Sequence, residues 1–295
     1  MKPSYTLALR SQNPRMTGIA IALLGALLMS FDPIFIRLSG VSGFDTAFLF
    51  GLFTAISMSA FIQLRDERGL IEVLKAGGWP IFLSGLLMLG SASALVLSIK
   101  NTSVANTFVI LSTSPALAAL FSWFFLKEIT RRSTWISIVF VMLGIAIVVS
   151  GSFGSGNLKG DLLAFFAVIC LSLNQTLLRK YQDVSRMASV GLGGLFLALT
   201  MAIVAEPSGY SLGTWVIMGA MGLFTAPFGR VMSAVAIRYI TAPEVGMILM
   251  TEVVFAPLFA FGFFGEIPPV ASFIGGAIIL VTVLIYAGLS AKREQ

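Results

Sequence analysis

Met250-Thr-Glu-Val-Val-Phe-Ala-Pro-Leu-Phe-Ala-Phe-Gly-Phe-Phe-Gly-Glu266 is the stretch that decides how this chain folds. It is almost wholly apolar, yet it carries Glu252 near its start and Glu266 at its end. Such a run is typical of a membrane-crossing helix, because about 20 apolar residues span the hydrocarbon core. At an offset of 138 residues, Ser112–Glu128 repeats the pattern without a gap, and only the later copy holds a carboxylate inside the run.

The composition of the whole chain is that of a membrane protein. Of its 295 residues, 57% are hydrophobic and 11% are charged. Soluble domains have about 25% charged and about 45–50% apolar residues, so these side chains exceed what a water-soluble interior holds. The chain has no histidine and one cysteine, Cys170, which excludes histidine-based catalysis, histidine-ligated metal and an intramolecular disulfide. We expect no cofactor.

Ten apolar segments near membrane length are separated by short polar breaks. The first follows a basic start, as a signal peptide does, but it is longer and has Asp32-Pro33 where cleavage would be expected, so we expect a retained helix. The predicted spans are Met16–Ile36, Thr46–Leu64, Pro80–Ile99, Ala105–Phe125, Thr134–Ser150, Asp161–Leu178, Val190–Val204, Thr214–Ala236, Glu244–Phe264 and Val270–Leu289.

Lysine and arginine are distributed unequally between the two sides of this arrangement. With the N-terminus inside, the inner segments hold fifteen of them and the outer segments hold three, namely Arg37, Lys100 and Lys159. Basic loops stay on the cytoplasmic side, so both termini are predicted to be cytoplasmic, in the cell (inner or plasma) membrane. Because the basic residues are dispersed in short loops, the net charge of +6 indicates orientation and not a nucleic-acid partner.

The repeat covers both halves of the chain. At an offset of 142 residues, Ser30 aligns with Ser172, Asp32 with Asn174 and Arg37 with Arg179. Spans one to five therefore correspond to spans six to ten, and an odd number of spans makes the second copy enter the membrane from the opposite face. Inverted repeats of this kind are typical of secondary transporters, whose substrate site lies where the copies meet.

These features resemble the drug/metabolite transporter superfamily of the EamA type. The residues that carry the resemblance are Pro115 to Glu128 and Glu252 to Glu266, each an apolar run that ends in Phe-x-x-Glu before a further span. The resemblance implies ten helices as two inverted five-helix repeats, residues 1–150 and 157–291, around a central cavity. It also implies export or exchange of small metabolites such as amino acids, and it does not fix the substrate.

Three charged side chains lie well inside predicted spans: Asp32, Arg230 and Glu252. A charge near the bilayer centre costs at least about 2.5–3.5 kcal/mol, so each needs a reason. Arg230 and Glu252 are predicted at similar depth on neighbouring antiparallel helices. They are interpreted either as an ion pair that a zwitterionic or carboxylate substrate opens, with Glu252 as carrier of a coupling proton, or as a permanent structural pair. Glu244, at the start of its span, is expected to reach lipid headgroups or Arg238.

Asp32 precedes Pro33, which opens the helical hydrogen-bond ladder. It is interpreted either as a proton or cation site on the outer side of the cavity, or as an interfacial group paired with Arg37. Its repeat mate Asn174, with Gln175 beside it, is a candidate for binding polar groups of a substrate or for bonding between helices.

Hydroxyl and amide side chains gather before Pro115 in the fourth span. Ser112, Thr113 and Ser114 either satisfy the carbonyls that the proline leaves free or, with Asn106 and Thr107, line the cavity opposite Glu252. Pro227 and Pro257 indicate kinks in the eighth and ninth spans, and therefore candidate hinges.

The predicted function is a secondary active transporter of small organic metabolites, with membrane lipid as a partner, and not an enzyme. An intramembrane enzyme is the first alternative, but Asp32 and Glu252 are predicted on opposite sides of the midplane. A channel-like permease would more often show rings of charge. A receptor would have no polar cavity. The sequence does not determine the substrate, the coupling ion or the oligomeric state.

Overall fold

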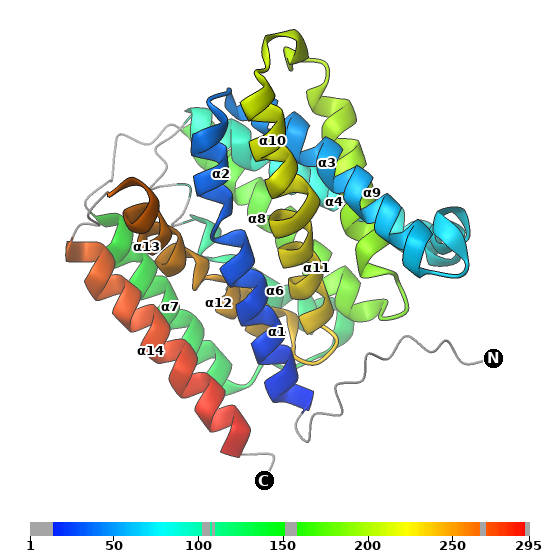
Figure 1. Cartoon of the computed structure of the whole chain (residues 1–295). Helices are drawn as coiled ribbons and strands as arrows, with labels where there is room; N and C mark the ends of the chain where they lie inside the picture. Colours follow the sequence, from blue (N-terminus) through cyan, green and yellow to red (C-terminus); the bar gives the residue numbers. More distant parts are fainter. Residues whose placement is uncertain (1–13, 102–106, 108–109, 151–157, 266–269, 293–295) are drawn as a thin grey trace.

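A computed structural model gives the arrangement of the helices (Figure 1). It describes residues 14–101, 107, 110–150, 158–265 and 270–292, and all regular structure in these residues is helical. Seven helical segments are long and apolar enough to cross a membrane, and three shorter apolar helices lie at the fourth, fifth and seventh predicted positions. Among the described residues these segments match the ten predicted spans, so the predicted fold class is confirmed.

The helices fall into two sets, one on each side of the undescribed residues 151–157, called the first half and the second half. The first half contains α1 (Pro14–Met29), α2 (Asp32–Ser39), α3 (Gly43–Arg65), α4 (Gly69–Asn101), α6 (Ser114–Phe121), the π-helical η1 (Ser122–Leu126) and α7 (Arg132–Val149). The second half contains α8 (Leu158–Lys180), α9 (Arg186–Met201), the short η3 (Pro207–Gly209), α10 (Leu212–Ala220), the π-helical η4 (Met221–Thr225), α11 (Ala226–Ala236), α12 (Ala242–Leu249), α13 (Glu252–Phe264) and α14 (Val270–Lys292).

The bundle has two ends, which are named here by their helices. Helix α1 begins at the end where α14 finishes, called the α1 end, and α2 lies toward the opposite end, called the α2 end (Figure 1). The third span starts earlier than predicted, because a helix from Gly69 joins it at a kink. Gly78 has φ 54° at this kink, a conformation that side chains with a Cβ seldom adopt.

The helices of the first half pack mainly against helices of the second half. Extensive contacts join α3 with α9 and with η4, α4 with α8 and with α9, α7 with α14, α1 with α11, and α6 with α12. Exchanging each helix for its repeat mate leaves this set of pairs unchanged. The two halves therefore interlock around a pseudo-twofold axis, as an inverted repeat requires, and do not meet at one flat interface.

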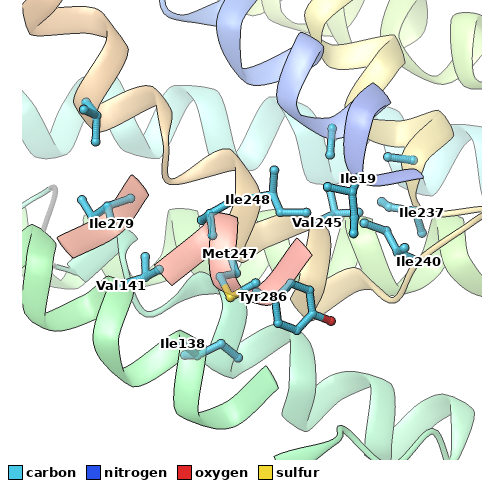
Figure 2. Close-up of a cluster of buried hydrophobic side chains, with 14 of the residues drawn as sticks. Ile19, Ile138, Val141, Ile237, Ile240, Val245, Met247, Ile248, Ile279 and Tyr286 are labelled. Atoms are coloured by element: carbon cyan, nitrogen blue, oxygen red, sulfur yellow. The ribbon is translucent and has the colours of Figure 1, made fainter. Parts of the chain in front are cut away.

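The largest buried apolar cluster holds α12 between α1, α7 and α14 (Figure 2). Met247 and Ile248 on α12 have no exposed surface, and the ring of Tyr286 on α14 packs into the same cluster. Lipid tails are as apolar as these side chains, so close packing stabilises the cluster in a membrane more than exclusion of water does. Helix α12 is thereby held as a rigid element beside the site described next.

Candidate functional site

The first span is broken directly before Asp32. Helix α1 ends at Met29, and α2 begins at Asp32 with Pro33 in its first turn. The hydroxyl of Ser30 donates to the carbonyl of Ala26 at 2.7 Å, and the backbone N–H of Ser30 donates to the same carbonyl at 2.9 Å. The ring of Phe31 stacks on Phe259 of α13, with 4.3 Å between the centroids. The break therefore presents the carboxylate of Asp32 inside the bundle, at the start of a half-helix.

The ninth span is broken in the same manner, directly before Glu252. Helix α12 ends at Leu249 and α13 begins at Glu252, so this carboxylate also lies in the first turn of a half-helix. The hydroxyl of Thr251 donates to the carbonyl of Ile248 at 2.8 Å. Interrupted helices where two repeats meet are typical of the binding sites of transporters.

The fourth span repeats this break at the equivalent position. Helix α6 begins at Ser114, the repeat mate of Glu252, and the hydroxyl of Thr113 donates to the carbonyl of Ile110 at 2.6 Å. This bond is the counterpart of the Thr251 bond in the second half. The carbonyl of Ile110 also accepts the backbone N–H of Thr113 at 3.0 Å, so it is not one that Pro115 leaves free. Ser112 is 2% exposed and, like Thr113, is not among the cavity-lining residues described next.

A cavity of about 350 Å³ lies between the two halves, a size typical of small-molecule sites. It is lined mainly by apolar side chains of α4, α8 and α9, such as Met88, Leu171 and Leu197. Its charged lining residues are Arg230 and Glu252, and Asn174 and Gln175 supply amide groups. Four predicted site residues therefore lie around one cavity. Asn106 lies outside the described residues.

Arg230 binds Asp32, so the predicted pair of Arg230 with Glu252 is wrong. Its Nη1 lies 3.1 Å from Oδ2 of Asp32 and also donates to the carbonyl of Ala226 at 3.2 Å. The guanidinium carbon lies 4.4 Å from the centre of the Phe50 ring. Because α1 packs along α11, the break in the first span brings Asp32 to the arginine, and the expected pairing of Asp32 with Arg37 is not found.

Glu252 remains beside this pair without a direct bond. Its carboxylate makes no hydrogen bond or ion pair with any described residue, and the charged groups that act on it are Asp32 and Arg230. Asp32 and Glu252 were predicted on opposite sides of the midplane, and the structure instead groups them around one arginine. The packing of α2 against α13 brings the two breaks together.

Asn174 makes a bond between helices, as one of its two interpretations expects, and this bond belongs to a polar cluster. The hydroxyl of Ser84 on α4 donates to Oδ1 of Asn174 at 2.6 Å and also contacts the hydroxyl of Ser189 on α9. All three residues are buried, and Asn174 and Ser189 line the cavity. Small polar residues inside apolar runs, such as Ser84 between Leu83 and Gly85, are the only signal that pointed to the cluster.

Polar bonds join the two halves at the α1 end. Glu244 accepts from Arg15 and from the hydroxyl of Tyr286, and its backbone partner Thr241 closes a capping box at the start of α12. The predicted contact of Glu244 with Arg238 or lipid headgroups is therefore replaced by a buried ion pair with Arg15. Helix α1 belongs to the first half and α12 to the second, so the bond crosses between them.

A second pair crosses at the same end. Arg179 donates from Nε to Glu128 at 3.0 Å and from Nη1 to the carbonyl of Ile237 at 2.9 Å. Glu128, the Glu at the end of the repeated run, follows η1 of the first half and Arg179 ends α8 of the second. These bonds fix the α1 end of the bundle across the pseudo-twofold axis.

The α2 end has its own bonds between the halves. Asp45 at the start of α3 accepts from the hydroxyl of Tyr210 at 2.6 Å and from the backbone N–H of Glu206 at 3.0 Å. The hydroxyl of Thr214 donates to the carbonyl of Ser39 at 2.9 Å. Burial and the bond to Asp45 raise the pKa of the Tyr210 phenol above its ordinary value, so it remains a donor at neutral pH. The cavity therefore lies between two bonded ends.

The EamA-like transporter family model matches this chain twice, over residues 16–150 and 158–288. The chain belongs to the EamA-like transporter family. Its relatives include human solute carrier family 35 member G1, 25% identical over 306 residues that cover 92% of this chain and 79% of that protein. Another is the uncharacterized transporter YwfM of Bacillus subtilis (strain 168), 23% identical over 234 residues that cover 75% of this chain and 77% of that protein.

A solved crystal structure has the same fold as this member of the EamA-like family. The two superimpose with a TM-score of 0.81 over 94% of this chain and 99% of the other, at 20% sequence identity. At that identity the likeness extends to the fold alone. The family and the transporter relatives together identify a multi-pass membrane protein with transporter activity.

Proposed function

We propose that this protein is a secondary active transporter that exports small organic metabolites through the cell (inner or plasma) membrane by alternating access. The observation that carries the proposal is the cavity between two inverted halves, where Arg230 and Glu252 are the charged lining residues. Two broken helices each present a carboxylate in this region, Asp32 and Glu252. Discontinuous helices around a site near the midplane are the elements by which inverted-repeat carriers bind their cargo.

The orientation follows from the distribution of basic residues. Lys and Arg are concentrated in the segments at the α1 end, which we therefore assign to the cytoplasm together with both termini. The bonds of Glu244 and Arg179 would then close the cytoplasmic side, and those of Asp45 and Thr214 the outer side. Alternating access requires that the bonds at one end break while the bonds at the other end stay formed.

Amino-acid-like solutes are the proposed cargo, and Glu252 is the proposed carrier of a coupling proton. Such solutes have an ammonium group that suits a carboxylate without a partner, and an apolar body that suits Met88 and Leu197. The carboxylate of Glu252 binds either a proton or the cargo, which links the two movements. Asp32 and Arg230 are the charged groups that face it.

An intramembrane enzyme is the alternative function. It requires a nucleophile or a second carboxylate free to act on a bound molecule. Asp32 lies near Glu252, but it is 7% exposed and engaged by Arg230, and it does not line the cavity. A channel requires a continuous polar path, whereas the described lining is mainly apolar. These features favour the transporter.

The proposal is tested by measuring which solutes leave cells that overproduce the protein, followed by flux of the best solute in proteoliposomes. We expect saturable flux that depends on the pH gradient and requires the protein. Absence of flux for every solute that the cells export differentially would contradict a transporter function.

A further inference from the structure

The cavity region holds two carboxylates, those of Asp32 and Glu252, and one cationic group, that of Arg230. Oδ1 of Asp32 and Oε1 of Gln175 are buried, and neither atom has a partner among the described residues. Both oxygens of Glu252 are also without a bond to any described residue. Arg230 is the cationic group of the described lining, and Asp32, Ala226 and the ring of Phe50 already engage it.

The helix dipole does not supply the positive charge that a second carboxylate lacks. Glu252 lies in the first turn of α13, where a carboxylate is stabilised by about 0.3–1 kcal/mol. The backbone N–H groups of Val253, Val254 and Phe255 are bonded to the carbonyls of Met250 and Thr251. They are therefore not free to donate to the Glu252 carboxylate. The first turn of α13 therefore leaves the oxygens of Glu252 without donors.

We propose that the cavity selects solutes with an ammonium or amidinium group, which binds Glu252, and that Asp32 sets this selectivity by keeping Arg230 neutralised. Such a cation supplies both the positive charge and the several N–H donors that the acceptors require. A carboxylate is not needed for binding, because Asp32 already balances the charge of the guanidinium that would receive it. This inference rests on the proposed function, and it narrows the substrate class and makes Asp32 a positioning residue.

The test uses three solutes with one phenylalkyl body: phenethylamine is a cation, phenylalanine a zwitterion and hydrocinnamate an anion. Binding to the purified full-length protein in detergent is measured by the rise in Tm as ligand is added, since a ligand that binds the folded state stabilises it. We expect a Kd for phenethylamine about tenfold or more below that for hydrocinnamate. Glu252→Gln should abolish the rise with phenethylamine, whereas Glu72→Gln, at an exposed pair with Lys75, should retain it.

Asp32→Asn tests the positioning role, because it leaves Arg230 charged without its partner. Hydrocinnamate should then bind more tightly than it does to the unmodified protein, and phenethylamine more weakly. Arg230→Gln should have the opposite effect and exclude hydrocinnamate, so the inference stays testable if one variant fails to fold. Tighter binding of the anion by the unmodified protein, equal binding of all three, or no binding of phenethylamine would overturn the inference.

Failure of the inference and failure of the proposed function give different results. The Tm measurement needs binding and no transport, so a preference for the amine without flux of any solute contradicts the transporter alone. Flux of acidic solutes without amine binding contradicts the cation selectivity alone.

Discussion

The substitution Gly51→Ala tests the interlocking of the two halves at its closest point. Gly51 on α3 packs against Gly194 on α9, and α9 belongs to the second half. A Cβ added at Gly51 would lie 2.7 Å from the carbonyl oxygen of Gly194 and 2.7 Å from the backbone N of Ala198. These atoms belong to the backbone, so the clash is relieved only if α3 and α9 separate.

The separation sets the expected loss of stability. Ordinary contact begins at 3.4 Å, so the two helices must move apart by about 0.7 Å. Inserting a methyl group into a packed interior typically costs about 1–3 kcal/mol. Alanine also favours a helix over glycine by about 1 kcal/mol, which offsets part of the loss. We therefore expect Gly51→Ala to lower the free energy of unfolding by up to about 2 kcal/mol.

The matched control is Gly262→Ala on α13, where an added Cβ meets nothing within 4 Å. Both variants carry the same helix-propensity gain, so their difference isolates the steric cost at the α3–α9 contact. The measurement is unfolding of the purified protein in mixed micelles with increasing dodecyl sulfate, followed by tryptophan fluorescence. Equal free energies of unfolding for the two variants would show that the helices are not packed this closely.

Three further predictions concern the polar bonds. Removing one partner of a fully buried ion pair costs about 3–5 kcal/mol. Asp32→Asn and Arg230→Gln should each destabilise the protein by less than this, because Arg230 is partly exposed to the cavity. The double variant should lose less than the sum in the same unfolding assay, and additivity would rule out the pair. Glu244→Gln should increase amide hydrogen exchange in α12 but not in η3, since it weakens the α1 end alone. Tyr210→Phe should increase exchange around η3 and spare α12, and a uniform change across the chain would contradict separate ends.

The sequence predicted the spans and the register of the repeat, because both depend on apolar length and on residue order. The alignment of Ser114 with Glu252 is an instance: both residues begin a helix directly after a threonine whose hydroxyl donates to the carbonyl three residues before it. A fixed offset in the chain thus predicted an equivalent break in the structure. Of these two breaks, only the one before Ser114 has a proline directly beside it, Pro115.

The pairing of Arg230 depended on information that the sequence lacks. Neighbouring spans in the chain suggested Glu252 as its partner, but the partner comes from α2, which is distant in sequence. Small residues determine which helices pack closely together, as Gly25 on α1 and Gly229 on α11 do. For Asn174 the sequence suggested bonding between helices but not the partner Ser84, since α4 and α8 meet only in the folded bundle.

Flux through Glu252→Gln proteoliposomes tests the central claim most directly. The substitution keeps the size of the side chain and removes the one carboxylate of the described cavity lining. We predict that the variant inserts and unfolds like the unmodified protein, that it loses solute flux at every pH, and that Glu72→Gln retains full flux. Unchanged flux of the Glu252→Gln variant across the pH range would contradict the role of Glu252 in transport.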